Sequence, residues 1–507
     1  MRAHQLILHL AWFFLPPALI GTAYVYFYPV LQNCRFPDAR AAESACHFDG
    51  ARKPAVAAEI APFRLLAFGD PQLEGDTSLP DANTVAFPSL QRVWDGERSG
   101  LRSAAVQFAT EDVPKLLQGY RKRLDLWGND RYLAHVYRSV SWWTQPTHTV
   151  VLGDLLGSQW IGDEEFGKRS DRFWNTVFKG TEKVPREITD ESGRVEMLGG
   201  DESWRKRVVA VAGNHDIGYA GDIDEHRIAR FEDTFGSVNW EITFRLNDST
   251  ANDLTSAFST LSTPSSPELR LVVLNSMNLD GPALHPELQR RSLDFLNTEL
   301  HGQKDQKGRA TVVLTHIPLH KEAGICVDAP FFSYHPSYEG GGIKEQNHLS
   351  ERTSDSILTG LVSDDPREST AIILNGHDHA GCDVYHYRDE NPAEEVEHPW
   401  LAKPYPHRST FVPSPSLEGK IREITVRSMM GSYGGNAGLL SAWFDHEAGT
   451  WEFAYADCPF SVQHIWWAVH VLDLVELGLW ILGVELLVWE EMGAERRAEE
   501  RDKLKKA

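Results

Sequence analysis

The stretch AIILNGHDH (371–379) places a short apolar run directly before a cluster of asparagine, aspartate and histidine. Four other apolar runs end in the same way: RLLAF before GDPQ (64–72), TVVL before GDLL (149–156), VVAVA before GNHD (208–216) and TVVL before THIPLH (311–320). Apolar runs of this length, bounded by glycine and polar residues, are typical of buried strands. Because ligands gather at the carboxyl ends of strands in α/β sheets, we expect the five endings to form one site.

Helical patterns separate these strands, so the sequence predicts an α/β fold. The periodicity predicts a helix over 112–143 with a break at Gly128, and a clearer amphipathic helix over 287–300. Near the end, ITVRSM (424–429), SAWFDH (441–446) and TWEFAYAD (450–457) predict a closing set of antiparallel hairpins.

The composition is that of a globular protein and excludes some partners. The chain has 507 residues, with 50 Lys and Arg against 72 Asp and Glu, and a formal charge of -22. Such a charge repels a phosphate backbone, so we expect no nucleic-acid partner. Five cysteines are too few for a disulfide scaffold.

Both ends of the chain are apolar. Residues 6–31 carry no charge and are long enough to cross a bilayer. We interpret residues 1–31 as a retained signal anchor, the alternative being a signal peptide cut near AESA (42–45). A second predicted span, 465–489, carries Asp473 and Glu476 on one helical face. We interpret these acids as a polar stripe against the first span or the lumenal domain; the alternative is a contact with a basic or amide group of a membrane partner.

Charge predicts the orientation. Residues 428–464 contain no Lys or Arg, whereas the tail at 490–507 contains six. The positive-inside rule then places both termini in the cytosol and the middle of the chain in the lumen. The final KLKKA resembles a dilysine retrieval signal, which predicts an endoplasmic reticulum membrane protein. Residues 32–62 are expected to be a lumenal linker, and 63–458 the catalytic domain.

The polar residues after the five strands have the chemistry of metal ligands. Imidazole, carboxylate and amide oxygen in one site suit Mn, Fe or Zn, and a set of this size can hold two metals that share one carboxylate. The candidate ligands are Asp70, Gln72, Asp154, Asn214, His316, His377 and His379.

The order GD, GD, GNHD, TH, GHDH is similar to the five-block signature of the calcineurin-like metallophosphoesterase superfamily. More narrowly, LWGNDRYL, GNHDIGY, HIPLHK, GHDHAGCDVYH and RSMMGSYGGNAGLL resemble the endoplasmic reticulum phosphoesterases that remodel GPI anchors, in their fungal form. The resemblance implies a β-sandwich flanked by helices and two divalent ions, with manganese as the metal. It also implies removal of ethanolamine phosphate from a mannose of the GPI glycan, which promotes export of GPI-anchored proteins toward the Golgi.

The resemblance also implies a role for each ligand. Asp70 and His379 belong to the first metal, Asp154 bridges the two, and the second is held by Asn214, His316 and His377. The superfamily usually begins D-x-H, whereas Gln72 stands at the third position here. A glutamine oxygen is a weaker and harder ligand than imidazole, so this departure favours Mn over Zn.

His215 is the expected catalytic group. The resemblance implies that it binds no metal and faces the phosphate, where it would either stabilise the developing charge or protonate the departing sugar oxygen. Asp216 either orients His215 or has a structural role. Weaker candidates for substrate contacts are His320, Tyr433 and Asn436.

The cysteines suggest two disulfides in an oxidising compartment. We hypothesise that Cys34 pairs with Cys46 and Cys326 with Cys382, which leaves Cys458 over. Asn247 begins an N-x-S/T sequon, so its loop is a candidate for glycosylation.

Two other functions remain open. The same metal core fits a phosphomonoesterase or nucleotide phosphatase, since the metal blocks do not define the leaving group. A non-catalytic membrane cargo factor with a degenerate site is the alternative from another class. The partners we expect are the lipid bilayer, GPI-anchored proteins as substrates and, as a further class, membrane proteins of cargo export.

Overall fold

The computed structural model describes residues 2–38, 60–75, 87–95, 101–246, 266–302, 308–362, 369–388, 400–406 and 419–506. The chain divides into two compact units, which are described separately. Unit 1 joins Met1–Asn33 to Pro459–Ala507, and unit 2 is Cys34–Cys458.

Unit 2 contains two large sheets. The first has six strands in the order β16-β15-β1-β2-β5-β3, in which β1, β2 and β5 run parallel. The parallel arrangement brings the carboxyl ends of these three strands to one edge. The strands are β1 (Phe63–Phe68), β2 (His148–Leu152), β3 (Glu182–Lys183), β5 (Arg207–Val211), β15 (Asn436–Asp445) and β16 (Thr450–Pro459).

The second sheet has eight strands in the order β13-β12-β14-β11-β8-β7-β6-β4. Here β7, β8, β11 and β14 run parallel. The strands are β4 (Val195–Met197), β6 (Trp240–Arg245), β7 (Glu268–Val273), β8 (Arg309–Leu314), β11 (Ser369–Asn375), β12 (Cys382–Arg388), β13 (Trp400–Pro404) and β14 (Ile421–Thr425). A small separate pair is formed by β9 (Phe332–Tyr334) and β10 (Ile343–Gln346).

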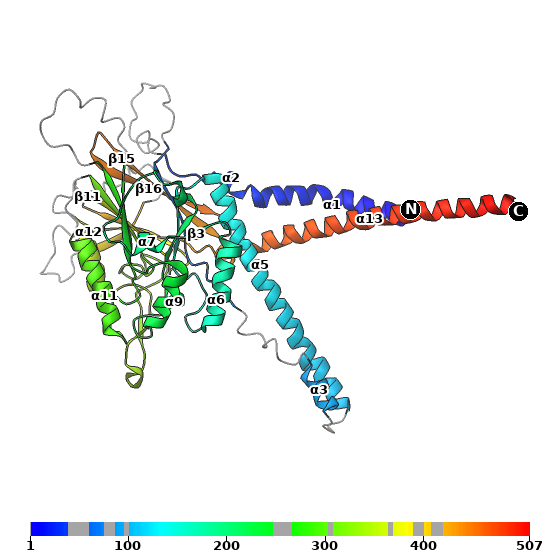
Figure 1. The fold of residues 1–507 in the computed structure, drawn as a ribbon, viewed down its shortest axis with the longest axis horizontal. Helices are drawn as coiled ribbons and strands as arrows, with labels where there is room; N and C mark the ends of the chain where they lie inside the picture. The colour runs from blue at the N-terminus through cyan, green and yellow to red at the C-terminus, as the bar shows by residue number, and fades with distance from the viewer. Residues whose placement is uncertain are drawn as a thin grey trace. The chain divides into compact units, whose positions relative to one another are not determined.

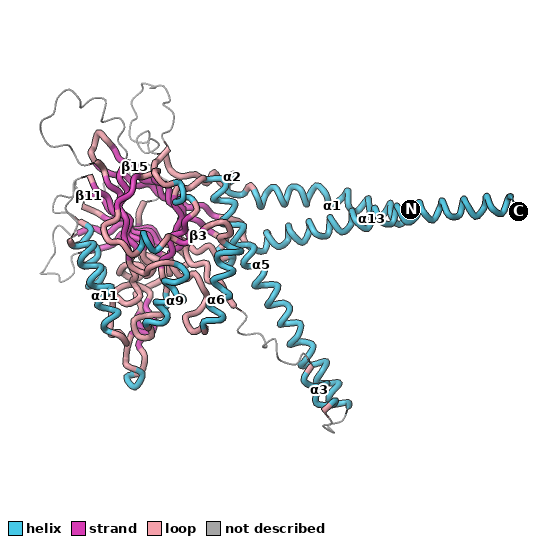
Figure 2. Tube along the Cα trace, viewed as in Figure 1, coloured by secondary structure: helices cyan, strands magenta, loops and turns pink. Residues whose placement is uncertain are grey.

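Both large sheets share one buried apolar cluster. Leu65, Val150 and Val209 enter it from the first sheet, and Val312 and Ile372 from the second. The strands therefore enclose a common core, and Figure 2 shows them gathered together with α6, α9 and α11 on their outside. The predicted α/β class is confirmed, and all five predicted strands that end in polar residues are present.

The helices of unit 2 lie between the strands in sequence. They are α3 (Pro88–Trp94), α4 (Leu101–Gln107), α5 (Val113–Thr144), α6 (Asp163–Arg172), α7 (Arg186–Thr189), α8 (Asn214–Ile217), α9 (Glu225–Phe235), α11 (Pro286–Leu296) and α12 (Glu351–Leu361). Short 3-10 or π turns are η2 (Phe108–Asp112), η3 (Phe173–Val177), η4 (Glu202–Arg205), η5 (Asn297–His301), η6 (Ser337–Glu339) and η7 (Gly431–Tyr433).

Two details of the predicted elements are wrong. Helix α5 passes through Gly128 without a break. The cost of one glycine, about 1 kcal/mol, is outweighed by the burial of Tyr132, Leu133 and Val136 in the next turns. The run ITVRSM does not join the closing hairpin, because β14 pairs with β11 and β12 of the other sheet.

Unit 1 consists of α1 (Ala3–Tyr26), α2 (Tyr28–Leu31) and α13 (Gln463–Lys506). Among the described residues, α1 is the helix that is long and apolar enough to cross a membrane. The second span stays a prediction, within a helix that continues far beyond it. Helices α1 and α13 lie side by side (Figure 1), and Thr22 donates to both carboxylate oxygens of Asp473 at 3.0 and 2.9 Å. Asp473 therefore faces the first helix, as the polar-stripe interpretation expects.

One of the two hypothesised disulfides is wrong. Cys34 pairs with Cys458, across a sequence separation of 424 residues, and not with Cys46. The fold brings the two ends of unit 2 together, which no local spacing reveals. Cys326 pairs with Cys382 as hypothesised. Cys46 and the sequon at Asn247 lie outside the described residues.

Candidate metal centre

The five polar strand endings meet at one place, although they come from two sheets. Asp70, Asp154 and Asn214 follow β1, β2 and β5 of the first sheet, and His316 and His377 follow β8 and β11 of the second. Four residues of these endings adopt the left-handed backbone conformation, which is strained for residues other than glycine. They are Asp70, Gln72, Asp154 and His377, with φ of 45°, 41°, 49° and 73°. Such strain is concentrated at functional sites.

The ligand atoms form two groups that overlap at one carboxylate. Asp154, His316 and His377 make one group, and Asp70, Asp154 and His379 make the other. Within each group, the ligand atoms all lie within 4.8 Å of one another. These groups have the membership that the resemblance implies, with Asp154 at the point of sharing.

In the group of His316 and His377, main-chain carbonyls hold both imidazoles. His316 Nδ1 donates to the carbonyl of Leu152 at 2.7 Å, and His377 Nε2 donates to that of Gln346 at 2.9 Å. Since a carbonyl only accepts, these bonds fix which nitrogen carries the proton. The opposite nitrogen of each ring is left as a ligand. His316 Nε2 lies 3.1 Å from Asn214 Oδ1, which brings the predicted amide ligand into this group.

Side chains hold the other group. His379 Nδ1 lies 3.2 Å from the Tyr433 hydroxyl, and His379 Nε2 lies 3.1 Å from Gln72 Nε2. Gln72 Nε2 also donates to Asp154 Oδ2 at 3.0 Å. The amide therefore lies between two ligands. With its nitrogen and oxygen exchanged, the same side chain presents an acceptor for a hard cation.

Burial sets the electrostatics of this centre. Desolvation, and then the charge of Asp154, raise the pKa of Asp70. Desolvation lowers the pKa of His377 to about 3 and also lowers that of His316, so both rings are in the neutral form that binds metals. Within the described part of the chain, no Lys or Arg forms an ion pair with Asp70 or Asp154. Two buried carboxylates without a cationic partner, beside neutral imidazoles, fit a pair of divalent ions.

The two expected catalytic residues are placed differently. His215 Nε2 lies 3.7 Å from Asp154 Oδ2, and the ring is half-buried at the edge of the cluster. The Asp216 carboxylate instead accepts three backbone N–H groups, from Leu155, Leu156 and Gly213. Asp216 thus braces the loop that carries Asp154 against the loop that carries Asn214. These contacts favour a structural role for Asp216 over orientation of the His215 ring.

The three weaker candidates are also separated by the fold. Tyr433 reaches the centre through its bond to His379. His320 lies 3.4 Å from Glu351 at the start of α12 and is not part of either ligand group. Asn436 is buried and donates to the carbonyls of Ser428 and Tyr433, so it closes a turn and does not face a substrate.

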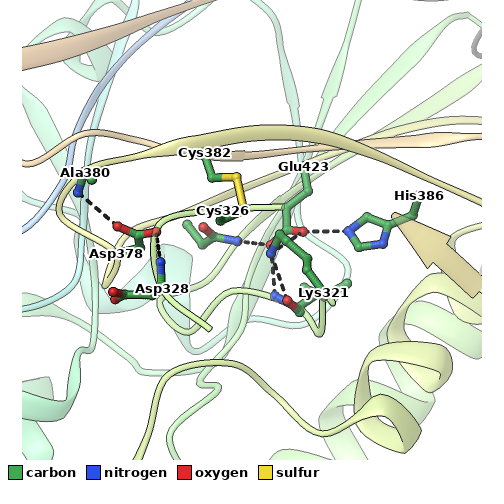
Figure 3. Close-up of a disulfide and its surroundings, with 10 residues drawn as sticks. Lys321, Cys326, Asp328, Asp378, Ala380, Cys382, His386 and Glu423 are labelled. Carbon is green, nitrogen blue, oxygen red and sulfur yellow. Dashed lines mark hydrogen bonds and ion pairs between the residues drawn. A yellow bond between two sulfur atoms is a disulfide. The ribbon is translucent and has the colours of Figure 1, made fainter. Parts of the chain in front are cut away.

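A buried ionic cluster behind the centre was missed at the level of sequence. Glu423 on β14 accepts from Lys321 at 2.9 Å, from Asn375 at 2.6 Å and from His386 at 2.6 Å. Figure 3 shows this cluster beside the Cys326–Cys382 disulfide. It connects the loop after β8 with β11 and β12, which carry or flank three of the histidine ligands. HIPLHK holds Lys321, but nothing in the sequence links this lysine to a glutamate 102 positions away.

The comparisons with known proteins give the chain its family. No family model matches. Protein TED1 of Saccharomyces cerevisiae is 31% identical over 466 residues, which cover 80% of this chain and 89% of that protein. An uncharacterized protein of Schizosaccharomyces pombe is 28% identical, over 63% of this chain and 64% of that protein. Metallophosphoesterase 1 of Xenopus laevis is 25% identical, over 52% and 58%.

Among solved structures, GAP50, the anchor in the inner membrane complex of Plasmodium, matches 66% of this chain and 84% of that chain. The TM-score is 0.32 and the identity 9%, which are too low to support an argument. The length and identity of the match to Protein TED1, together with the five strand endings and their shared centre, show that the chain belongs to the calcineurin-like metallophosphoesterase superfamily.

Proposed function

We propose that this chain is a metal-dependent phosphodiesterase of the endoplasmic reticulum that removes ethanolamine phosphate from a mannose of the GPI glycan. The observation that carries the chemistry is the pair of ligand groups that share Asp154. The motifs that resemble GPI-remodelling phosphoesterases support the substrate, and the length of the match to Protein TED1 supports a common architecture.

The chain's residues divide the work. Asp70, His379 and Gln72 would hold one ion, Asn214, His316 and His377 would hold the other, and Asp154 would be common to both. When bound, two divalent ions, which we propose to be manganese, supply an activated water and positive charge against the phosphoryl oxygens. The carbonyls of Leu152 and Gln346 keep the imidazoles oriented for this role, and burial keeps both rings neutral.

His215 is the group we assign to the leaving oxygen. Its ring is partly exposed beside Asp154, and its Nδ1 is buried without a hydrogen-bond partner among the described residues. As water attacks phosphorus, the bond from phosphorus to the mannose oxygen breaks. A proton from His215 then passes to that oxygen, which leaves a free hydroxyl on the mannose and releases ethanolamine phosphate.

The charge of the centre favours a diester. A phosphodiester carries one negative charge, and a monoester carries close to two at neutral pH. Within the described residues, the ion pairs of Asp70 and Asp154 are with histidines and none is with a Lys or Arg that would add positive charge for a second anionic oxygen. The overall charge of -22 also suits a substrate branch that bears an ammonium.

The ends of the chain suit a substrate that is held in a membrane. We propose that α1 is a retained span, that 465–489 is a second span, and that unit 2 lies in the lumen with both termini in the cytosol. GPI-anchored proteins in the same bilayer are the substrates, and membrane proteins of cargo export are the proposed partners.

The test is mass spectrometry of GPI glycans from cells that lack this chain, complemented with the wild-type chain or with Asp154→Asn. We expect the side branch to be retained without the chain and with the variant, and removed with the wild type. Rescue by Asp154→Asn would point to the non-catalytic cargo factor. An unchanged glycan in cells without the chain would contradict the phosphodiesterase proposal and favour the monoesterase function.

A further inference from the structure

The first half of α5 carries a stripe of exposed apolar side chains. Leu117, Tyr120, Leu124 and Trp127 are each more than half exposed, from 61% for Leu117 to 52% for Trp127. Their spacing of three, four and three residues puts all four on one face of the helix. Figure 1 shows this half of α5 extending away from the strands, with α3 beside its far end.

The stripe begins where the burial of α5 ends. In the second half of the same helix, Tyr132, Leu133 and Val136 are buried against the rest of the unit. The neighbouring helices add further apolar side chains to the projecting part, since Trp94 of α3 is 91% exposed and Val106 of α4 is exposed as well. Exposed apolar side chains grouped on one face of a helix in this way mark a binding face.

The charges beside the stripe indicate what binds there. Residues 113–131 contain five basic and two acidic residues, a local charge of +3 in a chain of -22. Arg123 lies over the ring of Tyr120 at 5.8 Å, and Arg131 over that of Trp127 at 5.7 Å. Leucine and aromatic side chains flanked by arginine are typical of helices that lie in the interface of a bilayer, where the guanidinium groups reach the phosphates.

The other end of α5 is fastened where the chain leaves the N-terminal apolar segment. Trp143 Nε1 donates to the Cys34 carbonyl at 2.7 Å, and Cys34 is bonded to Cys458. In sequence, Cys34 follows α2 by three residues, and Cys458 precedes α13 by five. Both connections to unit 1 therefore start from the disulfide beside this end of α5.

We propose that the apolar stripe of α5 rests on the lumenal leaflet as a membrane contact additional to the ends of the chain. This inference shares the membrane anchor with the proposed function but requires neither its substrate nor its reaction. The contact would hold unit 2 at the height of membrane-borne substrates.

The experiment uses the full chain with Cys46→Ser, so that the four disulfide cysteines are the remaining ones. Leu124→Cys is labelled with an environment-sensitive fluorophore and reconstituted in phosphatidylcholine nanodiscs, with and without brominated lipid. Gln118→Cys is the matched control, because it is exposed on the same helix but turned away from the stripe. We expect brominated lipid to remove about half of the fluorescence at position 124 and little at 118, as for an interfacial helix.

Equal quenching at both positions, or a fully aqueous spectrum at position 124, would overturn the proposal. Quenching of position 124 by a second labelled chain, and not by brominated lipid, would assign the stripe to contact between copies and would overturn it too. A separate readout is Leu124→Asp. It should slow hydrolysis of a bilayer-embedded GPI substrate while hydrolysis of a water-soluble diester stays unchanged, and a loss on both substrates would contradict a membrane role.

Discussion

The two ligand groups that share Asp154 differ in the hydrogen-bond partners that hold their histidines. Main-chain carbonyls of Leu152 and Gln346 hold the imidazoles of one group. In the other group, His379 lies within hydrogen-bond distance of the Tyr433 hydroxyl and the Gln72 amide. A carbonyl fixed in a sheet edge or strand end leaves its histidine little freedom, while side chains can rearrange. We therefore expect the carbonyl-braced group to hold its ion more tightly than the group of His379.

The largest effect is expected where the two groups meet. Asp154→Asn keeps the shape of the side chain but removes the charge that both groups use. Since changes to residues that only orient ligands cost 10 to about 100-fold, loss of the shared ligand should cost more than about 100-fold in diester hydrolysis. Metal analysis of the purified variant should show that both ions are lost. Retention of one ion at full occupancy would contradict a shared carboxylate.

Tyr433→Phe should weaken metal binding in the group of His379 and leave the other group unchanged. It removes the hydroxyl beside His379 Nδ1, so affinity for the more weakly held ion should fall by roughly 10 to 100-fold, measured by metal titration of hydrolysis. Tyr219→Phe is the comparison in the other group, because its ring lies 6.3 Å from that of His377, between centroids, and its hydroxyl bonds to the backbone of Gln346, whose carbonyl braces that histidine. Equal weakening by the two variants would remove the distinction between the groups.

Gln72→His should narrow the difference in metal affinity between the two groups. An imidazole at this position restores the D-x-H pattern and offers a softer and stronger ligand than an amide. We expect tighter retention of the weakly held ion by about 10-fold and a shift in metal preference from manganese toward zinc. Competition titrations with the two metals measure both effects. An unchanged preference would show that Gln72 does not act as a ligand.

His148, at the end of β2 away from Asp154, is a buried histidine outside both ligand groups, so its effect on stability can be compared with theirs on metal binding. His148 is buried between Phe63, Trp204 and Phe244, and desolvation, followed by the charges of Arg205 and Arg64, lowers its pKa to about 3. The unfolded chain, with a pKa near 6.5, binds more protons than the folded one between these values. Stability should therefore be complete above pH 6.5 and fall as the pH drops below it.

His148→Phe should remove this part of the acid sensitivity without changing metal binding. Between pH 7 and pH 5 the wild type should lose about 2 kcal/mol of unfolding free energy more than the variant, as measured by urea denaturation. Identical pH profiles for the two proteins would show that His148 is not buried in its neutral form.

The strands and their polar endings are predictable because each is a local pattern of an apolar run followed by ligand-type residues. The same locality explains the errors. The partners of Cys34 and Lys321 lie 424 and 102 positions away, so only the fold reveals them. The break assigned to Gly128 fails because tertiary packing overrides one residue's helix propensity, and the exposed stripe of α5 could not be told from a buried one by its spacing alone.

The central claim is that the shared-carboxylate centre cleaves a phosphodiester on the GPI glycan. Its most direct test is mass spectrometry of a GPI glycan that carries ethanolamine phosphate on mannose, after incubation with the purified full-length protein and manganese. We predict that the wild type releases ethanolamine phosphate and leaves an unmodified mannose, whereas Asp154→Asn leaves the branch in place. A glycan left intact by a wild-type protein that hydrolyses simple monoesters would contradict the account.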